Sequence, residues 1–313
     1  MANISFYSVD DNAAQALELL RKNLAGHTIW QWPDIGCAAE QLDYAICWQP
    51  PAEFFDGASG LKGILSMAAG VDHLLNHPGL PQGVPLIRLC DAGMGKKIAE
   101  YVHYGVLRSH RGFDRYQIHQ QAGNWNPQPD IDAADYHVGI MGFGVIGKMV
   151  ANHLHNAGYQ VSAWKRSPET EAFPYQVLHG DIAAFLQPLN VLVCVLPLTA
   201  QTKNIVNAEV LSHLPQGAHF INVGRGSQVV ESDLLLALDS GRLSSALLDV
   251  CVEEPLPEKH RFWTHPKVLI TPHIAGPTQL HLSVTQIIRS ITDMEAGQSP
   301  VSLQGIVSTH RGY

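Results

Sequence analysis

The chain has 313 residues and a formal net charge of −8 at pH 7, because 28 acidic side chains outnumber 20 lysines and arginines. This length is sufficient for two domains of ordinary size, each with its own hydrophobic core. The acidic balance and the scattered basic residues argue against a protein that binds nucleic acid or an anionic membrane surface.

The sequence predicts no membrane span, no secretory leader and no metal site. The apolar run at residues 191–198 has the length of a strand rather than of a membrane helix. The first residues lack a charged segment followed by a long apolar one. The five cysteines are widely spaced without a C-x-x-C pair, and the 17 histidines do not cluster at ligand spacing. We therefore expect a cytoplasmic protein with free thiols and no bound metal.

The first hundred residues alternate predicted strands and helices. Strands are predicted at residues 3–9, 42–48, 61–67 and 86–89, and a helix starts at Asp10 or Asp11 and continues to Leu24. This alternation is typical of a parallel sheet covered by helices. A long helix without proline is predicted from Lys97 to about Gln121, and the asparagine- and proline-rich run at residues 124–129 ends it.

A glycine-rich turn follows the apolar strand at residues 137–141 and precedes a helical segment at residues 145–156. Its G-x-G-x-x-G pattern between a strand and a helix is the fingerprint of a dinucleotide-binding fold. The helix N-terminus offers free N–H groups to a pyrophosphate. The residues predicted to surround it are Gly142, Phe143, Gly144, Val145, Ile146 and Gly147.

The next strand, at residues 159–164, ends in Lys165, Arg166 and Ser167. An NAD-binding domain usually carries an acidic residue near this point, which accepts hydrogen bonds from the ribose hydroxyls. This chain has two cations and a hydroxyl there instead, a combination that suits a 2′-phosphate. We therefore expect NADP(H) as the preferred cofactor, with NAD(H) as the alternative, unless the two cations are an ordinary solvated loop pair.

Polar residues follow three later strands of the same series. Strands are predicted at residues 190–196, 218–222, 245–249 and 268–271, and a last helix at residues 278–296. Arg225, Glu254 and His273 each come shortly after one of these strands, at the edge of the sheet where ligands bind. A guanidinium can bind a carboxylate and polarise a carbonyl, and an imidazolium beside a carboxylate can act as a general acid. One such residue is usually structural, but three on successive strands predict a catalytic set.

Five motifs in the same order resemble those of the D-isomer-specific 2-hydroxyacid dehydrogenases. They are the glycine loop and the segments at residues 196–199, 222–226, 249–256 and 271–276. The resemblance implies that Arg225 binds a 2-keto acid, Glu254 tunes the histidine and His273 donates the proton. It also implies cofactor contacts from a set around the nicotinamide: Leu196, Pro197, Val223, Gly224 and Asp249. The family further implies a homodimer, with the long helix after Ala99 at the interface.

The first domain contains a segment that resembles the substrate loop of the family. The small residues Ala69 and Gly70 leave backbone N–H groups available for a carboxylate, although a plain strand-to-helix turn fits as well. Trp48 ends a strand and closes the pocket beside Gly70 or lies in the core, and an indole in the pocket favours a short substrate.

Together these features predict an α/β protein of two doubly wound parallel-sheet domains. A Rossmann NAD(P)-binding domain at residues 105–278 is inserted into a flavodoxin-like substrate domain at residues 1–104 and 279–313. Within the family, the segments at residues 45–51 and 93–102 resemble the bacterial reductases of glyoxylate and hydroxypyruvate. We therefore expect NADPH-dependent reduction of these two small 2-keto acids. Reduction of pyruvate, a larger keto acid or 3-phosphoglycerate, and a non-catalytic nucleotide sensor, remain the alternatives.

Overall fold

The computed structural model describes residues 1–308 and 312, which form two compact units. The first unit contains residues 1–93 and the chain from residue 278 onward, and the second contains residues 94–277. The first boundary therefore lies before the predicted division at residue 104. The reason is that the helix beginning at Met94 packs along the helix Val145–Asn156 of the second unit and belongs with it.

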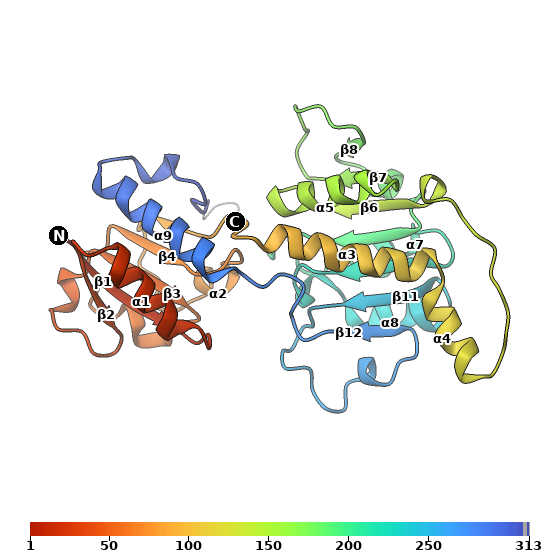
Figure 1. The fold of residues 1–313 in the computed structure, drawn as a ribbon, viewed down its shortest axis with the longest axis horizontal. Helices are drawn as coiled ribbons and strands as arrows, with labels where there is room; N and C mark the ends of the chain where they lie inside the picture. The colour runs from red at the N-terminus through yellow and green to blue at the C-terminus, as the bar shows by residue number, and fades with distance from the viewer. Residues whose placement is uncertain (309–311, 313) are drawn as a thin grey trace. The chain divides into compact units, whose positions relative to one another are not determined.

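The first unit is a five-stranded parallel sheet in the order β2-β1-β3-β4-β5. Its strands are β1 (Asn3–Ser8), β2 (Thr28–Gln31), β3 (Tyr44–Trp48), β4 (Gly63–Ser66) and β5 (Leu86–Ile87). Its helices are α1 (Ala13–Asn23), α2 (Asp72–Leu75) and α9 (Leu280–Glu295). This strand order is the flavodoxin-like arrangement. Helix α9 packs beside α1, so the C-terminal part of the chain completes the N-terminal unit (Figure 1).

The second unit is a seven-stranded parallel sheet in the order β12-β11-β10-β9-β6-β7-β8. Its strands are β6 (His137–Met141), β7 (Gln160–Trp164), β8 (Gln176–Leu178), β9 (Val191–Cys194), β10 (Ala218–Asn222), β11 (Leu243–Leu248) and β12 (Val268–Ile270). Its helices are α3 (Met94–His110), α4 (Phe113–Gln121), α5 (Val145–Asn156), α6 (Ile182–Leu186), α7 (Ala208–Ser212) and α8 (Glu231–Asp239). The order reverses between β6 and β9, which is the switch point where a doubly wound sheet binds its ligand.

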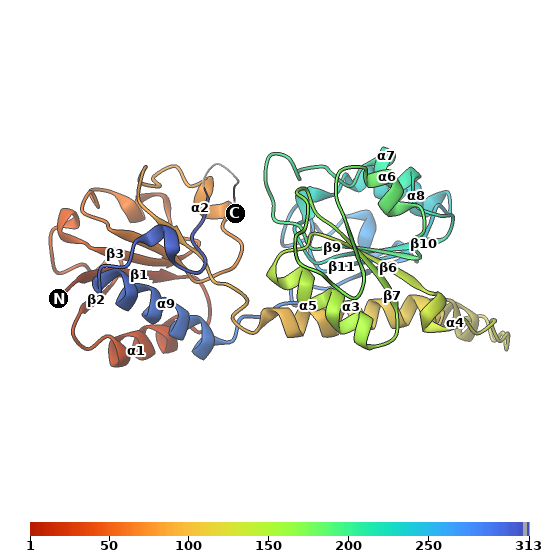
Figure 2. The same cartoon turned by 90° about the horizontal axis from the view of Figure 1, so that it is seen from above.

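Helices cover both faces of the second sheet. Figure 2 shows α3 and α5 against one face and α6, α7 and α8 against the other. The central strand β9 is apolar throughout, because both of its faces are covered: all four of its residues are buried. A cluster that includes Phe185, Phe220 and Phe262 fills the layer between the sheet and α6 to α8. This core fixes the strand ends from which the site residues emerge.

The fold class is confirmed, and three elements differ from the prediction. The single helix expected over residues 97–121 is wrong, because Gly112 adopts a left-handed conformation (φ 64°) that separates α3 from α4. The sequence also missed β2 and β8, two short edge strands. None of the three residues of β8 is buried, so this strand has no apolar pattern to reveal it.

Among the described residues, no helix combines the length and the apolar character that crossing a membrane requires.

Candidate active site

The glycine loop lies at the switch point and leaves its backbone open. Gly142 has a φ of 111°, and a Cβ there would lie 2.7 Å from the Val195 carbonyl oxygen. A Cβ on Gly147 would collide with the Gly142 carbonyl oxygen, so this glycine allows the helix to pack against the strand. By contrast, a Cβ on Gly144 would have no atom within 4 Å. The open space at Gly144, at the start of α5, fits the approach of a pyrophosphate.

The side chains of the other residues in this loop differ in how far they are buried. Phe143 is buried, and its ring packs edge-on against Phe173 with the ring centroids 4.9 Å apart. Ile146 is partly buried in the first turn of α5, whereas Val145 is half exposed. The backbone of the loop is therefore the part that offers hydrogen-bond donors, while Phe143 anchors the loop to the segment after β7.

Arg225 lies in a turn after β10 that two buried amides hold in place. The Asn222 side chain accepts a hydrogen bond from the Gly224 N–H (3.1 Å) and donates one to the Arg225 carbonyl oxygen (3.1 Å). The Gln228 side chain accepts from the Arg225 N–H (2.9 Å) and donates to the Leu196 carbonyl oxygen (2.7 Å). Both amides are 0% exposed, so their hydrogen bonds are made in a water-poor interior. They connect the predicted catalytic turn to the loop of Leu196 and Pro197.

His273 and Glu254 form the pair that the sequence predicted. The Nδ1 atom of His273 lies 2.8 Å from Oε2 of Glu254. The other carboxylate oxygen of Glu254 accepts a hydrogen bond from the Cys251 N–H at 2.9 Å. Since Nδ1 is engaged by the carboxylate, the Nε2 atom of the imidazole is the one left to face a ligand.

The pKa of Glu254 reflects these neighbours. Burial raises the pKa of this carboxyl. The hydrogen bonds from His273 and Cys251 and the positive charge of Arg225 lower it by a larger amount, so the net pKa is below its ordinary value. The Glu254 carboxylate is thus ionised at neutral pH and is suited to orient an imidazolium. Glu254 therefore lies close enough to both His273 and Arg225 for their charges to act on its carboxylate.

Asp249 is buried, and its carboxylate is bonded to the loop that carries His273. It is 2% exposed, and its carboxylate accepts hydrogen bonds from the Thr271 hydroxyl (2.6 Å) and from the N–H groups of Ile274 and Ala275 (both 2.8 Å). Tyr101 of α3 in turn donates to the Thr271 hydroxyl at 2.6 Å. These contacts fix the loop that carries His273. Both oxygens of the Asp249 carboxylate, which the family resemblance placed near the nicotinamide, accept hydrogen bonds from this loop.

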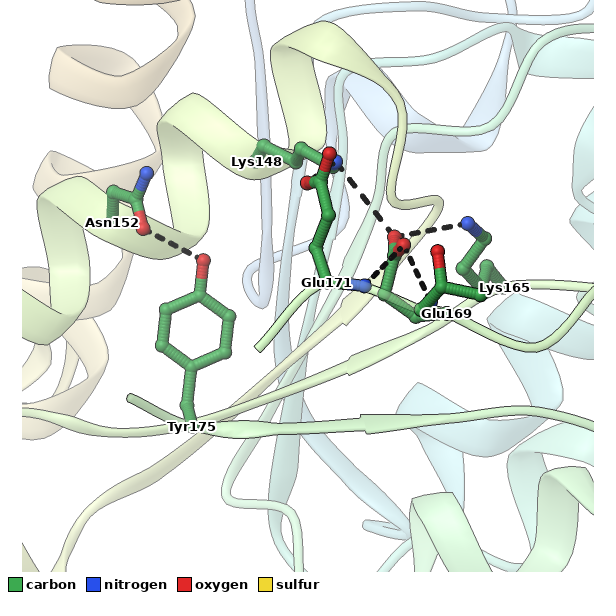
Figure 3. A network of polar contacts seen from close by, with 7 residues as sticks. Lys148, Asn152, Lys165, Glu169, Glu171 and Tyr175 are labelled. Carbon is green, nitrogen blue, oxygen red and sulfur yellow. Dashed lines mark hydrogen bonds and ion pairs between the residues drawn. The ribbon is translucent and has the colours of Figure 1, made fainter. Parts of the chain in front are cut away.

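Lys165 forms an ion pair with an acidic residue of its own loop. Glu169 accepts a hydrogen bond from the Lys165 Nζ at 3.0 Å, four residues farther along the chain (Figure 3). Residues 165–167 themselves contain no acid, as the sequence analysis stated. The acid comes later than in the usual NAD-binding pattern, and the loop after β7 turns back to place it there.

Arg166 and Ser167 continue the same loop. The Arg166 guanidinium donates a hydrogen bond to the Gln201 side chain, which comes from the loop after β9. Ser167 is exposed. The Val223 N–H donates to the Cys194 carbonyl oxygen at 3.1 Å, which joins the loops after β9 and β10. Because the strands of this sheet are parallel, the predicted cofactor residues after β7, β9 and β10 all lie at the same edge of the sheet.

The predicted substrate residues of the first unit lie at the carboxyl ends of β3 and β4. Trp48 ends β3 and packs edge-on against His73 with the ring centroids 4.5 Å apart. Ala69 and Gly70 follow β4, and neither backbone N–H donates a hydrogen bond to another described residue. Trp48 is partly exposed and is thus not part of the closed core of this unit.

Four residues of the site were missed by the sequence analysis. Asn222 and Gln228 orient Arg225, Thr271 joins Asp249 to Tyr101, and Glu169 pairs with Lys165. Only Asn222 and Thr271 carried a signal, because they lie inside the motifs that were recognised. The roles of Gln228 and Glu169 depend on how their loops turn.

Comparison with known proteins places this geometry in a family. The family model described as "D-isomer specific 2-hydroxyacid dehydrogenase, NAD binding domain" matches residues 104–275. A protein of Yersinia enterocolitica named glyoxylate/hydroxypyruvate reductase A is 41% identical, over 99% of this chain and 100% of the relative. One of the same name from Serratia proteamaculans is 42% identical, with the same coverage.

Solved structures are similar over the same length. A D-isomer specific 2-hydroxyacid dehydrogenase from Xanthobacter autotrophicus Py2, in complex with NADPH and MES, superimposes with a TM-score of 0.92. It is 35% identical and covers 100% of this chain and 99% of its own. An NADPH-dependent glyoxylate/hydroxypyruvate reductase from Sinorhizobium meliloti, in complex with NADP and sulfate, gives a TM-score of 0.90 at 32% identity, covering 100% of both chains. The chain thus belongs to the D-isomer specific 2-hydroxyacid dehydrogenase family, as its ordered motifs predicted.

Proposed function

We propose that the protein is an NADPH-dependent reductase of small 2-keto acids, which converts glyoxylate to glycolate and hydroxypyruvate to D-glycerate. The observation that carries the proposal is the His273–Glu254 pair, with Nδ1 and Oε2 2.8 Å apart on strand ends next to Arg225. Full-length relatives at about 41% identity that bear the name glyoxylate/hydroxypyruvate reductase A support the choice of substrates.

The second unit holds the cofactor in this proposal. The open backbone at Gly144 and the N-terminus of α5 receive the pyrophosphate, and the loops of Leu196, Pro197, Val223 and Gly224 border the nicotinamide. Lys165, Arg166 and Ser167 bind the 2′-phosphate of NADP(H), which is preferred to NAD(H). The bound cofactor supplies the hydride. Asp249 contributes indirectly, because its hydrogen bonds position the loop of His273.

His273 supplies the proton. When hydride reaches the keto carbon, the oxygen gains a negative charge and needs a proton to become the hydroxyl of the product. The imidazolium releases that proton from Nε2, while Nδ1 keeps its hydrogen bond to the Glu254 carboxylate. Glu254 thereby holds the ring in one orientation and stabilises its charged form before transfer.

Arg225 and the first unit bind the substrate. The Arg225 guanidinium binds the carboxylate of the 2-keto acid and polarises the neighbouring carbonyl. The first unit is the substrate domain: the Ala69 and Gly70 N–H groups provide donors for a carboxylate, and Trp48 limits the length of the substrate.

The deciding experiment compares initial rates with glyoxylate, hydroxypyruvate and pyruvate, each with NADPH and with NADH. We expect rapid oxidation of NADPH with the first two keto acids and slower oxidation of NADH. Faster turnover of pyruvate or a larger keto acid would identify a different dehydrogenase of the same family. If neither cofactor is oxidised with any of the three, the proposed activity is refuted in favour of a nucleotide-binding protein without catalysis.

We further propose that the protein is a cytoplasmic homodimer. The five free cysteines support a reducing compartment, where disulfides are rare. Exposed apolar side chains at the end of α3 and along α4 support an interface with a second copy of the chain.

A further inference from the structure

We propose that Glu169 is a built-in counter-ion for the cofactor's 2′-phosphate site, which the phosphate must displace from Lys165 in order to bind. Glu169 then sets how strongly the protein prefers NADP(H) to NAD(H). The inference rests on the proposed function, in which Lys165 and Arg166 receive the 2′-phosphate.

The contacts of Glu169 are those that a bound phosphate would use. Its Oε2 accepts a hydrogen bond from the Lys165 Nζ at 3.0 Å, and its Oε1 accepts from the N–H groups of Thr170 (2.9 Å) and Glu171 (3.3 Å). Figure 3 shows the carboxylate enclosed by these donors at the end of β7. An ammonium group together with consecutive backbone N–H groups is the usual composition of an anion site. Here the anion is a side chain of the same loop.

The carboxylate is held firmly for a side chain in a loop. The side chain of Glu169 is only 10% exposed, whereas that of Lys165 is 27% exposed. The hydrogen bond from Lys165 and those from the backbone lower the pKa of Glu169 to about 2, so the carboxylate is ionised throughout the pH range in which the enzyme works. A cofactor that arrives at Lys165 therefore always meets a competing negative charge.

Lys148 offers Glu169 a second partner once Lys165 is taken. The Lys148 Nζ lies 3.7 Å from Glu169 Oε2 and 2.7 Å from Glu171 Oε2. The same ammonium lies 5.5 Å and 5.0 Å from the ring centroids of Phe143 and Phe173. This second cation belongs to α5 and is fixed by the aromatic residues. The Glu169 carboxylate can therefore exchange Lys165 for Lys148 without being left unpaired.

The exchange affects only cofactors that carry the 2′-phosphate. That group has a charge of about −1.5 to −2 at neutral pH, so it competes well against a single carboxylate, but some of its attraction to Lys165 is lost in breaking the existing pair. NADH carries no such group and leaves the Lys165–Glu169 pair intact. Glu169 thus reduces the preference for NADP(H) below what Lys165 and Arg166 alone would give.

The test is direct binding to the full chain by isothermal titration calorimetry, without a keto acid. The ligands are NADPH, NADH and two fragments that differ only in the phosphate, adenosine 2′,5′-bisphosphate and 5′-AMP. We expect Glu169→Gln to tighten the binding of NADPH and of the bisphosphate by about two- to fivefold, the range for one ion pair near the protein surface, and to leave NADH and 5′-AMP unchanged.

Glu258→Gln is the control, because Glu258 is an exposed acid in the loop after β11 and its loss removes one negative charge without changing Lys165, Lys148 or Glu169. It should leave the preference for the bisphosphate unchanged. Unchanged or weaker NADPH binding in Glu169→Gln, or an equal gain for NADH, would overturn the inference. Lys165→Gln distinguishes a failure of the Glu169 inference from a failure of the proposed 2′-phosphate site. If wild type prefers the bisphosphate to 5′-AMP and Lys165→Gln abolishes the preference, the phosphate site stands whatever Glu169→Gln does.

Discussion

His273 occupies a backbone conformation that few side chains adopt. Its φ is 55°, in the left-handed region, which costs a non-glycine residue on the order of 1–3 kcal/mol. The surrounding chain holds it there, because its N–H donates to the carbonyl oxygens of Asp249 (2.9 Å) and Thr271 (3.0 Å). The buried Asp249 carboxylate holds the next two residues of the loop. The fixed backbone therefore orients the His273 imidazole toward Glu254.

Replacing either member of the pair therefore has separable effects. We expect His273→Ala to lower kcat by a factor on the order of 10² or more, because the proton donor is lost. Glu254→Gln keeps the shape but removes the charge that stabilises the imidazolium, so kcat should fall less at acidic pH than at neutral pH. The measurement is a pH–rate profile with NADPH and glyoxylate.

The neighbouring Glu253 is exposed and provides the control, since Glu253→Gln should leave the whole profile unchanged. Unaltered turnover in His273→Ala would remove the histidine from the reaction. A pH profile of Glu254→Gln that parallels that of the wild type would remove the electrostatic role of Glu254.

At the scale of elements, the geometry of parallel strands made part of the site predictable. The carboxyl ends of β10, β11 and β12 meet at one edge, so Arg225, Glu254 and His273 could be brought together from chain order alone. Gln228 could not, because its hydrogen bonds to Arg225 and Leu196 depend on the exact path of two loops. In the same way β8 exists through its pairing with β7 and not through any local apolar pattern.

Helices α3 and α4 and the segment after them expose several large apolar side chains. Helix α4 has no buried residue, and Phe113 and Ile118 on it are 54% and 51% exposed. Trp125, in the segment after α4, is 98% exposed. Figure 1 shows α4 and this segment extending beyond the sheet of the second unit. Exposed aromatic residues of this kind are typical of a protein interface.

The homodimer proposal predicts that Trp125→Ser combined with Ile118→Ser weakens self-association by at least about tenfold, since each buried anchor contributes roughly 1–2 kcal/mol. Sedimentation equilibrium over a range of protein concentrations measures this change. Leu236→Ser is the control, because Leu236 is 66% exposed on α8, away from α4 in the chain. A wild-type chain that sediments as a monomer, or a double variant that remains as dimeric as the wild type, contradicts the assignment.

At the scale of the whole molecule, three histidines are partly buried in surroundings that favour the neutral ring. Burial lowers the pKa of His137, and burial together with the charge of His153 lowers the pKa of His103. The largest effect is at His219, where burial lowers the pKa to about 4; Asp114 opposes this shift, and Arg115 and Arg108 add to it. The Nδ1 atom of His219 lies 2.6 Å from the Ser245 hydroxyl, a contact that the neutral ring can make as an acceptor.

These histidines make the folded protein sensitive to acid below neutral pH. The unfolded chain binds a proton at each histidine near pH 6.5, whereas the folded chain resists it, so the free energy of unfolding should fall as the pH decreases below about 6.5. For His219 the loss continues until its folded pKa of about 4 and amounts at most to roughly 3 kcal/mol.

His219→Asn retains an acceptor for Ser245 and removes the titration. Urea unfolding between about pH 7.5 and pH 4 should therefore show a smaller decrease for this variant than for the wild type. The same substitution at the exposed His179 should reproduce the wild-type decrease, and equal slopes for His219→Asn and wild type would mean that His219 carries no such penalty.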